Sequence, residues 1–111
     1  MAEFVTVRRT MARPGRADEY ASVHSRIPEV AAAQLREQGI LNWTIWRDGD
    51  RLVHVIVSRA PYGEIIASLR SQPAVDAEWN ARIADLLSAE DGADVLLAPV
   101  WGMDESEQWS K

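Results

Sequence analysis

The sequence predicts an α+β fold in which helices cover one face of an antiparallel sheet. Two observations support this prediction. Two neighbouring runs rich in β-branched and aromatic residues are separated by a short turn, and helix-forming stretches flank this pair on both sides. A further strand-like run lies towards each end of the chain, which gives the order strand, helix, strand, strand, helix, strand. The length of 111 residues is typical of one domain, residues 1–111.

The first half of the chain predicts one strand and one interrupted helix. Residues 3–11 alternate and contain β-branched side chains, so we expect a strand that ends at the following Pro-Gly turn. Residues 17–38 suit a helix, and Gly39 is placed to end it. Pro28 lies within this stretch and should kink or divide the helix, because proline removes a helical hydrogen bond and its ring clashes with the preceding turn.

The central part of the chain predicts a β-hairpin. Residues 40–47 and 52–58 are alternating runs joined by an Asp-Gly-Asp turn, which is a strong hairpin signal. Residues 61–71 and 73–89 then favour two helical pieces, and residues 93–101 favour a final strand. The polar tail, residues 105–111, is expected to be loose.

This order of elements is the pattern of a ferredoxin-like βαββαβ sandwich, with helices on one face of a four-stranded antiparallel sheet. In the second strand Leu41, Trp43 and Ile45 point to one side and Trp46 to the other, so both faces carry bulky apolar surface. A second copy of the sheet could bury the outer face. We therefore expect a homodimer of the dimeric α/β-barrel type.

Charge and composition limit the possible partners. Twelve basic and seventeen acidic residues give a net charge of −5, which disfavours nucleic acid and anionic membranes and suits a neutral ligand better than a phosphorylated one. The absence of cysteine fits a reducing compartment, and the N-terminus lacks the order of a secretory signal, so we expect a cytoplasmic protein. The two histidines lack metal-ligand spacing and the glycines are scattered singly, so neither a metal nor a nucleotide cofactor is expected.

Tyr20 and His24 are the strongest candidates for chemistry. They are four residues apart in the first helical stretch, so they lie on one face about one turn apart. Ile27, Ala31 and Leu35 continue this face, which directs the pair towards the sheet. An inward histidine can give or take a proton near neutrality. The alternative is a core histidine that binds a backbone carbonyl, with a tyrosine hydroxyl that reaches solvent; the spacing leaves both interpretations open.

Two tryptophans are predicted in the same layer as this pair. Trp43 lies on the more apolar face of its strand, which is the face expected to meet the helices. Trp79 belongs to the inward stripe of the last helix, formed by Val75, Trp79, Ile83 and Leu86. Such indole rings can line a sugar pocket or simply fill the core. His54 alternates with Leu52 and Ile56, and we interpret it as structural or interfacial.

The order and spacing of these residues resemble the L-rhamnose mutarotase family over residues 4–104. The resemblance implies a dimeric ferredoxin-like fold without a cofactor, and a substrate that is an unphosphorylated deoxyhexose such as L-rhamnose or L-fucose, whose α and β anomers are interconverted. The matching segments are Pro14, Asp18-Glu19-Tyr20, His24, Ile27-Pro28-Glu29-Val30, Gly39-Ile40, Asn42-Trp43-Thr44-Ile45 and Trp79.

The resemblance also implies roles for single residues. The histidine that matches His24 is the proton donor in that family, and the tyrosine that matches Tyr20 binds the sugar. The positions that match Trp43, Trp79 and Asn80 also line the substrate site. The family usually has a tyrosine in place of Trp43 and a second tryptophan in place of Asn80.

Two other functions compete with a mutarotase. Small ferredoxin-like dimers also resemble cofactor-independent monooxygenases of aromatic polyketides, which would bind a coloured polycyclic compound and consume oxygen. A non-catalytic sugar-binding module would bind sugar without accelerating anomer exchange.

Overall fold

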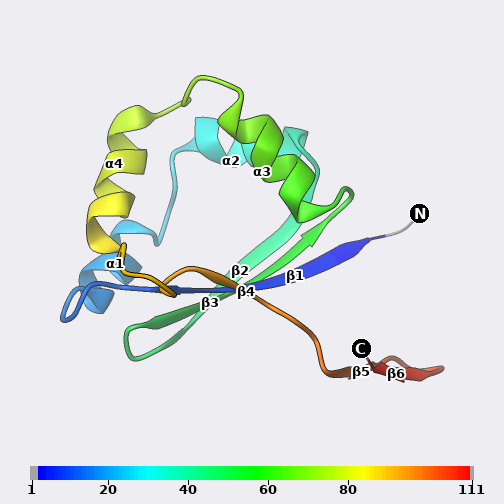
Figure 1. The fold of residues 1–111 in the computed structure, drawn as a ribbon. Coiled ribbons are helices and arrows are strands. Elements are labelled where there is room, and N and C mark those ends of the chain that lie inside the picture. The colour runs from blue at the N-terminus through cyan, green and yellow to red at the C-terminus, as the bar shows by residue number, and fades with distance from the viewer. Residues whose placement is uncertain (1–2, 111) are drawn as a thin grey trace.

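The computed structural model describes residues 3–110, whose main body is a four-stranded antiparallel sheet with helices over one face (Figure 1). Among these residues, no helix has the length and apolar character that crossing a membrane requires. The elements are β1 (Phe4–Met11), α1 (Ala17–Val23), α2 (Glu29–Glu37), β2 (Ile40–Asp48), β3 (Arg51–Ser58), α3 (Tyr62–Arg70), α4 (Ala77–Leu86), β4 (Val95–Leu97), β5 (Trp101–Met103) and β6 (Gln108–Ser110).

The strand order confirms the ferredoxin-like prediction. The sheet runs β2-β3-β1-β4, and each neighbouring pair is antiparallel. Helices α2, α3 and α4 arch over one face of this sheet, and α1 packs against α4 (Figure 1). The two long helical regions therefore connect strands that are not hydrogen-bonded to each other, as the split βαβ pattern requires.

Pro28 divides the first helical stretch, as the sequence predicts. Helix α1 ends at Val23 and α2 begins at Glu29, so the proline occupies the position just before the first turn of the second helix. There its missing N–H costs no helical hydrogen bond. The break turns the chain, and it leaves His24 as the residue that ends α1.

A bulge in β2 corrects one predicted side-chain direction. The sequence predicts Leu41 on the same face as Trp43, but the pairing with β3 shifts between Ile40 and Asn42. This extra residue reverses the alternation at the start of the strand. Ile40 is consequently buried, whereas Leu41 is 44% exposed and Trp43 keeps its predicted position towards the helices.

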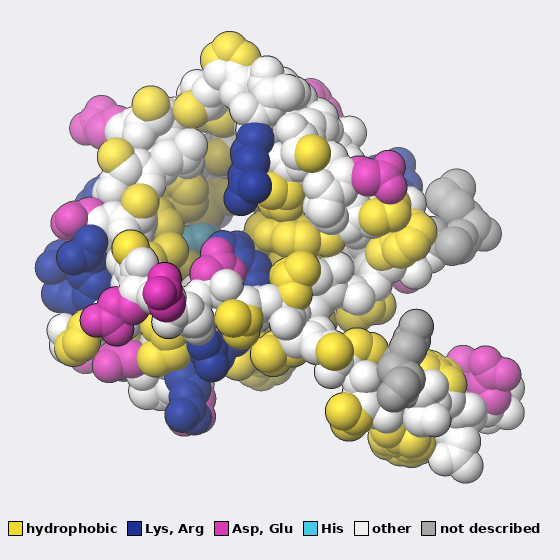
Figure 2. Space-filling model, in the orientation of Figure 1, with side chains coloured by type: hydrophobic (Ala, Val, Ile, Leu, Met, Phe, Trp, Pro, Cys, Tyr) yellow, Lys and Arg dark blue, Asp and Glu magenta, His cyan; other side chains and the backbone are white. Residues whose placement is uncertain are grey.

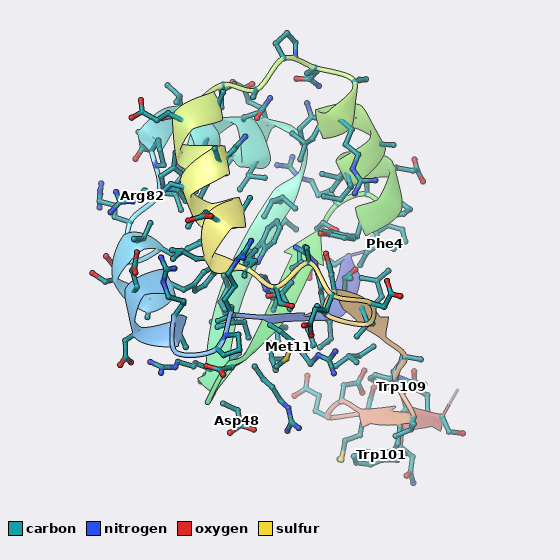
Figure 3. All side chains as sticks on the ribbon, turned by 60° about the vertical axis from the view of Figure 1, so that its left-hand side comes forward. Phe4, Met11, Asp48, Arg82, Trp101 and Trp109 are labelled. Atoms are coloured by element: carbon teal, nitrogen blue, oxygen red, sulfur yellow. The ribbon has the colours of Figure 1, made fainter. Side chains whose placement is uncertain are left out.

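The C-terminal region differs from the prediction. The strand expected over residues 93–101 is confined to Val95–Leu97, and the chain leaves the sheet near Pro99, which has no N–H to donate to a neighbouring strand. The tail expected to be loose includes β6, which pairs with β5 in a separate hairpin. This hairpin projects from the sheet and holds Trp101 and Trp109 (Figures 1 and 3).

The core is split into two clusters that leave space between them. Ala12, Ala17, Tyr20, Leu52 and Leu86 pack together at one end of the sheet. Ile40, Ile56 and Ile65 form the second cluster at the other end. Leu52 belongs to the first cluster and Ile56 to the second, and the polar residue His54 lies between them along β3.

Candidate active site

A cavity of about 880 Å³ lies between the helices and the sheet. Figure 2 shows its opening, with apolar side chains inside and a histidine at depth. The volume is within the range of small-molecule sites in proteins. All of the site residues predicted from the sequence line this cavity, namely Tyr20, His24, Trp43, Trp79 and Asn80.

Helix α1 places Tyr20 and His24 side by side, as their spacing predicts. Their ring centroids are 5.3 Å apart, with 31° between the ring planes. Tyr20 is anchored in the core and is only 3% exposed, while His24 is half-buried at the end of the helix. The imidazole of His24 interacts with its own backbone through a hydrogen bond that partly opposes the effect of burial on its pKa. The nitrogen that is not engaged by the backbone can serve a ligand.

Burial shifts the pKa values of this pair in opposite directions. Desolvation lowers the pKa of His24 below its usual value, because the cationic imidazolium is the form that loses hydration. Desolvation raises the pKa of Tyr20, and the positive charge of Arg8 partly opposes this rise. At neutral pH the site therefore holds a neutral imidazole beside an un-ionised phenol. One of these groups can accept a proton and the other can donate one.

Helix α4 brings Trp79 to the other side of His24. The two rings meet edge to face, with centroids 5.5 Å apart and an interplanar angle of 64°. The start of α4 is held by Asp76, whose Oδ1 accepts a hydrogen bond from the backbone N–H of Trp79 at 2.9 Å. Trp79 is thus fixed in the first turn of the helix, and Asn80 lines the cavity next to it.

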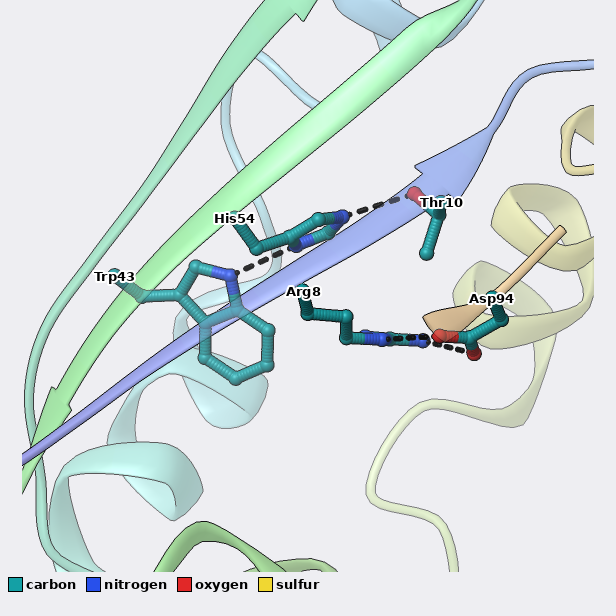
Figure 4. Close-up of polar contacts among 5 residues, drawn as sticks. All are labelled: Arg8, Thr10, Trp43, His54 and Asp94. Atoms are coloured by element: carbon teal, nitrogen blue, oxygen red, sulfur yellow. Dashed lines mark hydrogen bonds and ion pairs between the residues drawn. The ribbon is translucent and has the colours of Figure 1, made fainter. Parts of the chain in front are cut away.

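His54, which the sequence analysis interprets as structural or interfacial, lies beside the predicted site residues. It is 4% exposed on β3, faces the helices and lines the cavity. Its Nε2 lies 2.9 Å from Thr10 Oγ1, and its Nδ1 lies 3.1 Å from Trp43 Nε1 (Figure 4). Desolvation, with smaller contributions from Arg8 and His24, lowers the pKa of His54 to about 4. The alternation of His54 with two buried aliphatic residues was the available signal that it points inward.

Arg8 and Asp94 form a second polar feature that the sequence did not reveal. Arg8 Nε lies 2.8 Å from Asp94 Oδ1, and Arg8 Nη2 lies 2.6 Å from Asp94 Oδ2 (Figure 4). The two side chains therefore form a bidentate ion pair. The hydrogen bonds to the carboxylate raise the pKa of Arg8 and lower the pKa of Asp94. This pair fixes a positive charge at the cavity wall, on the strand that also carries Thr10.

The arrangement combines proton-handling groups with flat apolar surfaces. Tyr20 and His24 approach the cavity from α1, whereas Arg8, Thr10 and His54 approach it from the sheet. Across residues 3–110, no group of three or more His, Cys, Asp or Glu side chains is placed to hold a metal ion. The groups that are present suit proton transfer to and from the oxygens of a small ligand.

Comparisons with known proteins give one family and one fold. A family model described as L-rhamnose mutarotase matches residues 5–105. No curated protein sequence matches the chain. Tetracenomycin F2 cyclase from Streptomyces glaucescens, a type-II polyketide cyclase, is similar in structure with a TM-score of 0.63 and 20% identity, over 91% of this chain and 99% of that chain.

Two further solved structures share the fold. SnoaB, a cofactor-independent oxygenase from Streptomyces nogalater, has a TM-score of 0.58 and 19% identity, over 96% of this chain and 100% of that chain. A NIPSNAP family protein from Agrobacterium tumefaciens has a TM-score of 0.53 and 21% identity, over 88% and 93% of the two chains. At these identities the similarity establishes a common fold, and fold alone does not assign chemistry.

Proposed function

Because the chain belongs to the L-rhamnose mutarotase family, we propose that it interconverts the α and β anomers of an unphosphorylated deoxyhexose such as L-rhamnose or L-fucose. The observation that supports this most directly is the Tyr20–His24 pair, which lines the same cavity as Trp43 and Trp79. Mutarotation requires only proton transfers and rotation about a bond, so it needs no cofactor. The side chains in this cavity suffice for it.

Ring opening needs one base and one acid. The proton leaves the anomeric hydroxyl, the carbonyl forms at the anomeric carbon, the bond to the ring oxygen breaks, and the ring oxygen takes a proton. We assign the base to His24, because its lowered pKa leaves it neutral at pH 7. Tyr20, or a water molecule that it positions, supplies the proton for the ring oxygen. Arg8 favours this step, because its positive charge stabilises negative charge on the phenol oxygen.

Reclosure reverses these roles. After the aldehyde rotates, the protonated His24 returns its proton to the carbonyl oxygen, which becomes the new anomeric hydroxyl. The ring oxygen gives its proton back to Tyr20 and attacks the anomeric carbon from the other face of the carbonyl. His24 is therefore the base of the opening step and the acid of the closing step.

The aromatic walls account for binding of a neutral sugar. Trp43 and Trp79 present flat apolar faces, which suit the C–H faces of a pyranose and the methyl group of a deoxyhexose. The net charge of −5 disfavours a phosphorylated sugar. Asn80 offers an amide that can both donate and accept hydrogen bonds to sugar hydroxyls.

Saturation-transfer NMR on equilibrium mixtures of anomers tests the proposal. We expect accelerated exchange with L-rhamnose or L-fucose, slower exchange with D-glucose, and loss of the acceleration in His24→Ala. Tyr20→Phe should retain binding but lose most of the rate. Wild-type protein that accelerates none of the three sugars would rule the proposed function out.

The alternative is a cofactor-independent monooxygenase of an aromatic polyketide. The observation that favours it is the size of the cavity, about 880 Å³ with aromatic side chains on several walls, which also suits a polycyclic ligand. Oxygen consumption with such a compound, without sugar exchange, would identify it. Sugar binding without exchange would instead indicate a non-catalytic sugar-binding module.

We also propose a homodimer that acts in the cytoplasm. The outer face of the sheet is apolar and open, with Val5 66% exposed and Trp46 63% exposed. The register places Val53, Val55 and Val57 on the same face as these two residues. A second copy of this chain is the occupant that the family resemblance implies, and stacking two such sheets would bury this surface.

A further inference from the structure

The hydrogen bonds around His54 can be given a single direction. The indole nitrogen of Trp43 carries a hydrogen and can only donate, so His54 Nδ1 must accept. A neutral imidazole has one accepting and one donating nitrogen, which leaves the hydrogen on Nε2. His54 Nε2 therefore donates to Thr10 Oγ1. The opposite direction would require both ring nitrogens to accept, which only an anionic imidazolate could do.

This direction leaves the hydroxyl hydrogen of Thr10 without a protein acceptor. Thr10 is 3% exposed and lines the cavity, and the bond from His54 is its only side-chain hydrogen bond among residues 3–110. A buried donor without an acceptor is costly. The cavity is the space from which an acceptor can reach it. Thr10 Oγ1 accepts a hydrogen bond from His54 Nε2, so the hydrogen of the Thr10 hydroxyl has to find a different acceptor.

We propose that Thr10 donates a hydrogen bond to an oxygen of the bound sugar, and that Trp43 and His54 are positioning residues that hold Thr10 in the donating state. The inference rests on the proposed function, since it names the contact that the sheet makes with the same substrate. Tyr20 and His24 act on the anomeric end from α1, whereas Thr10 recognises another part of the sugar from β1.

The proposal gives Trp43 a second role besides stacking. Its indole ring forms part of the cavity wall, but its N–H points to His54 and is not free for the ligand. Thr10 then supplies a polar contact on this side of the cavity. An analogue that lacks the accepting oxygen would leave the buried Thr10 hydroxyl without a partner, so the site should discriminate strongly against it.

Kinetics of Thr10 variants test this contact. We expect Thr10→Val to lower kcat/KM for the preferred sugar roughly ten- to hundredfold. Thr10→Ser keeps the hydroxyl and should stay within about threefold of wild type. Thr6→Val is the matched control, because Thr6 is on the same strand and the same face but does not line the cavity. Equal kinetics of Thr10→Val and wild type would overturn the proposal, as would equal losses in Thr10→Val and Thr10→Ser.

Substrate analogues separate recognition from a general effect on the fold. Each hydroxyl of the preferred sugar is replaced in turn by hydrogen, and kcat/KM is measured for wild type and Thr10→Val. Removal of one particular hydroxyl should lower kcat/KM in wild type. The same removal should cause little further loss in Thr10→Val, because the variant has already lost that contact. Independent, additive losses at every position would contradict the assignment of Thr10 as the donor.

The direction of the hydrogen bonds can be tested without any activity. Nitrogen-15 NMR of the ligand-free protein should show His54 as the Nε2–H tautomer, and Trp43→Phe should abolish this preference while Trp46→Phe preserves it. An Nδ1–H tautomer in wild type would overturn the inference even if the protein is a mutarotase. Protein that exchanges no sugar would refute the proposed function, and with it the sugar as the acceptor, whereas an Nε2–H tautomer would still show that Thr10 Oγ1 accepts a hydrogen bond from His54.

Discussion

In the proposed mechanism His24 and Tyr20 act as a pair, because the same burial lowers the pKa of the base and raises the pKa of the acid. Loss of hydration penalises the cationic form of His24 and the anionic form of Tyr20, so both groups are neutral before the reaction begins. A neutral pair can exchange protons with an equally neutral sugar without a prior change in charge. Arg8 then limits the cost of the transient negative charge on Tyr20.

The pH dependence of the reaction follows from the state of His24. Its lowered pKa means that the neutral form is lost only as the pH falls below the ordinary histidine range, near ~6.5. We expect kcat/KM to rise with pH through the acidic range and to be level from about pH 7. The measurement is anomer exchange between pH 4.5 and 8. A rate that falls as the pH rises from 6 to 7 would show that the protonated form starts the reaction.

His54 couples the stability of the fold to pH. Its pKa is about 4 in the folded protein, below the value of ~6.5 in the unfolded chain, so the unfolded state binds more protons in between. The contribution of neutral His54 to the stability of the folded state is therefore complete above about pH 6.5 and is lost as the pH falls. We expect a loss on the order of 3 kcal/mol in the free energy of unfolding between pH 7 and pH 4.

Urea unfolding at fixed protein concentration measures this loss. His54→Gln is the matched variant, because its amide does not titrate and retains one donor and one acceptor. The variant should unfold more easily at pH 7 but should show a flatter dependence of stability on pH. The same slope in both proteins would mean that another group causes the acid sensitivity.

The first residues of β2 and the first turn of α4 position the aromatic side chains that line the cavity. The bulge at the start of β2 lets Ile40 and Trp43 face the helices together, although an even alternation would separate them. The start of α4 is fixed by Asp76, whose carboxylate accepts the N–H of Trp79. The walls of the cavity thus depend on a strand irregularity and a helix cap.

Removing the cap of α4 should affect stability and substrate binding together. We expect Asp76→Ala to lower the free energy of unfolding by about 1 kcal/mol, because the first turn loses a hydrogen-bond acceptor. The KM for the sugar should rise more than kcat falls, since the proposed role of Trp79 is to contact the ligand and not to transfer protons. Asp76→Ser keeps a cap and is the control. An unchanged KM in Asp76→Ala would show that the wall does not depend on the cap.

The whole molecule has one face that builds the site and one that remains open. Helices α2, α3 and α4 cover the inner face (Figure 1). The outer face carries apolar residues from three neighbouring strands. Association would serve mainly to bury the outer face.

A charge on the outer face should prevent association. Trp46→Lys places an ammonium group where two apolar sheets would meet, and its desolvation opposes dimer formation. We expect wild type to sediment as a dimer and the variant as a monomer or a much weaker dimer. Val30→Lys is the control, because Val30 is similarly exposed but lies on α2. Dimerisation that is insensitive to Trp46→Lys would place the interface elsewhere.

The sequence by itself determined the elements and the side chains that depend on local spacing. Alternation over residues 40–47 and 52–58 predicted the hairpin, and the four-residue interval between Tyr20 and His24 predicted that both reach one cavity. Pro28 predicted the division of the first helical stretch. These features follow from backbone geometry within a few residues, so a single chain segment contains the information.

Only the tertiary structure decided how groups from different strands meet. Arg8 and Asp94 are 86 residues apart, and Thr10 and His54 are 44 apart, so no local period relates them. The shift of register at Ile40 likewise exists only once β2 lies against β3. Local spacing fixes which face a side chain occupies, but its partner depends on which strands pair and in what register. The folded sheet sets that register through the packing of its buried face.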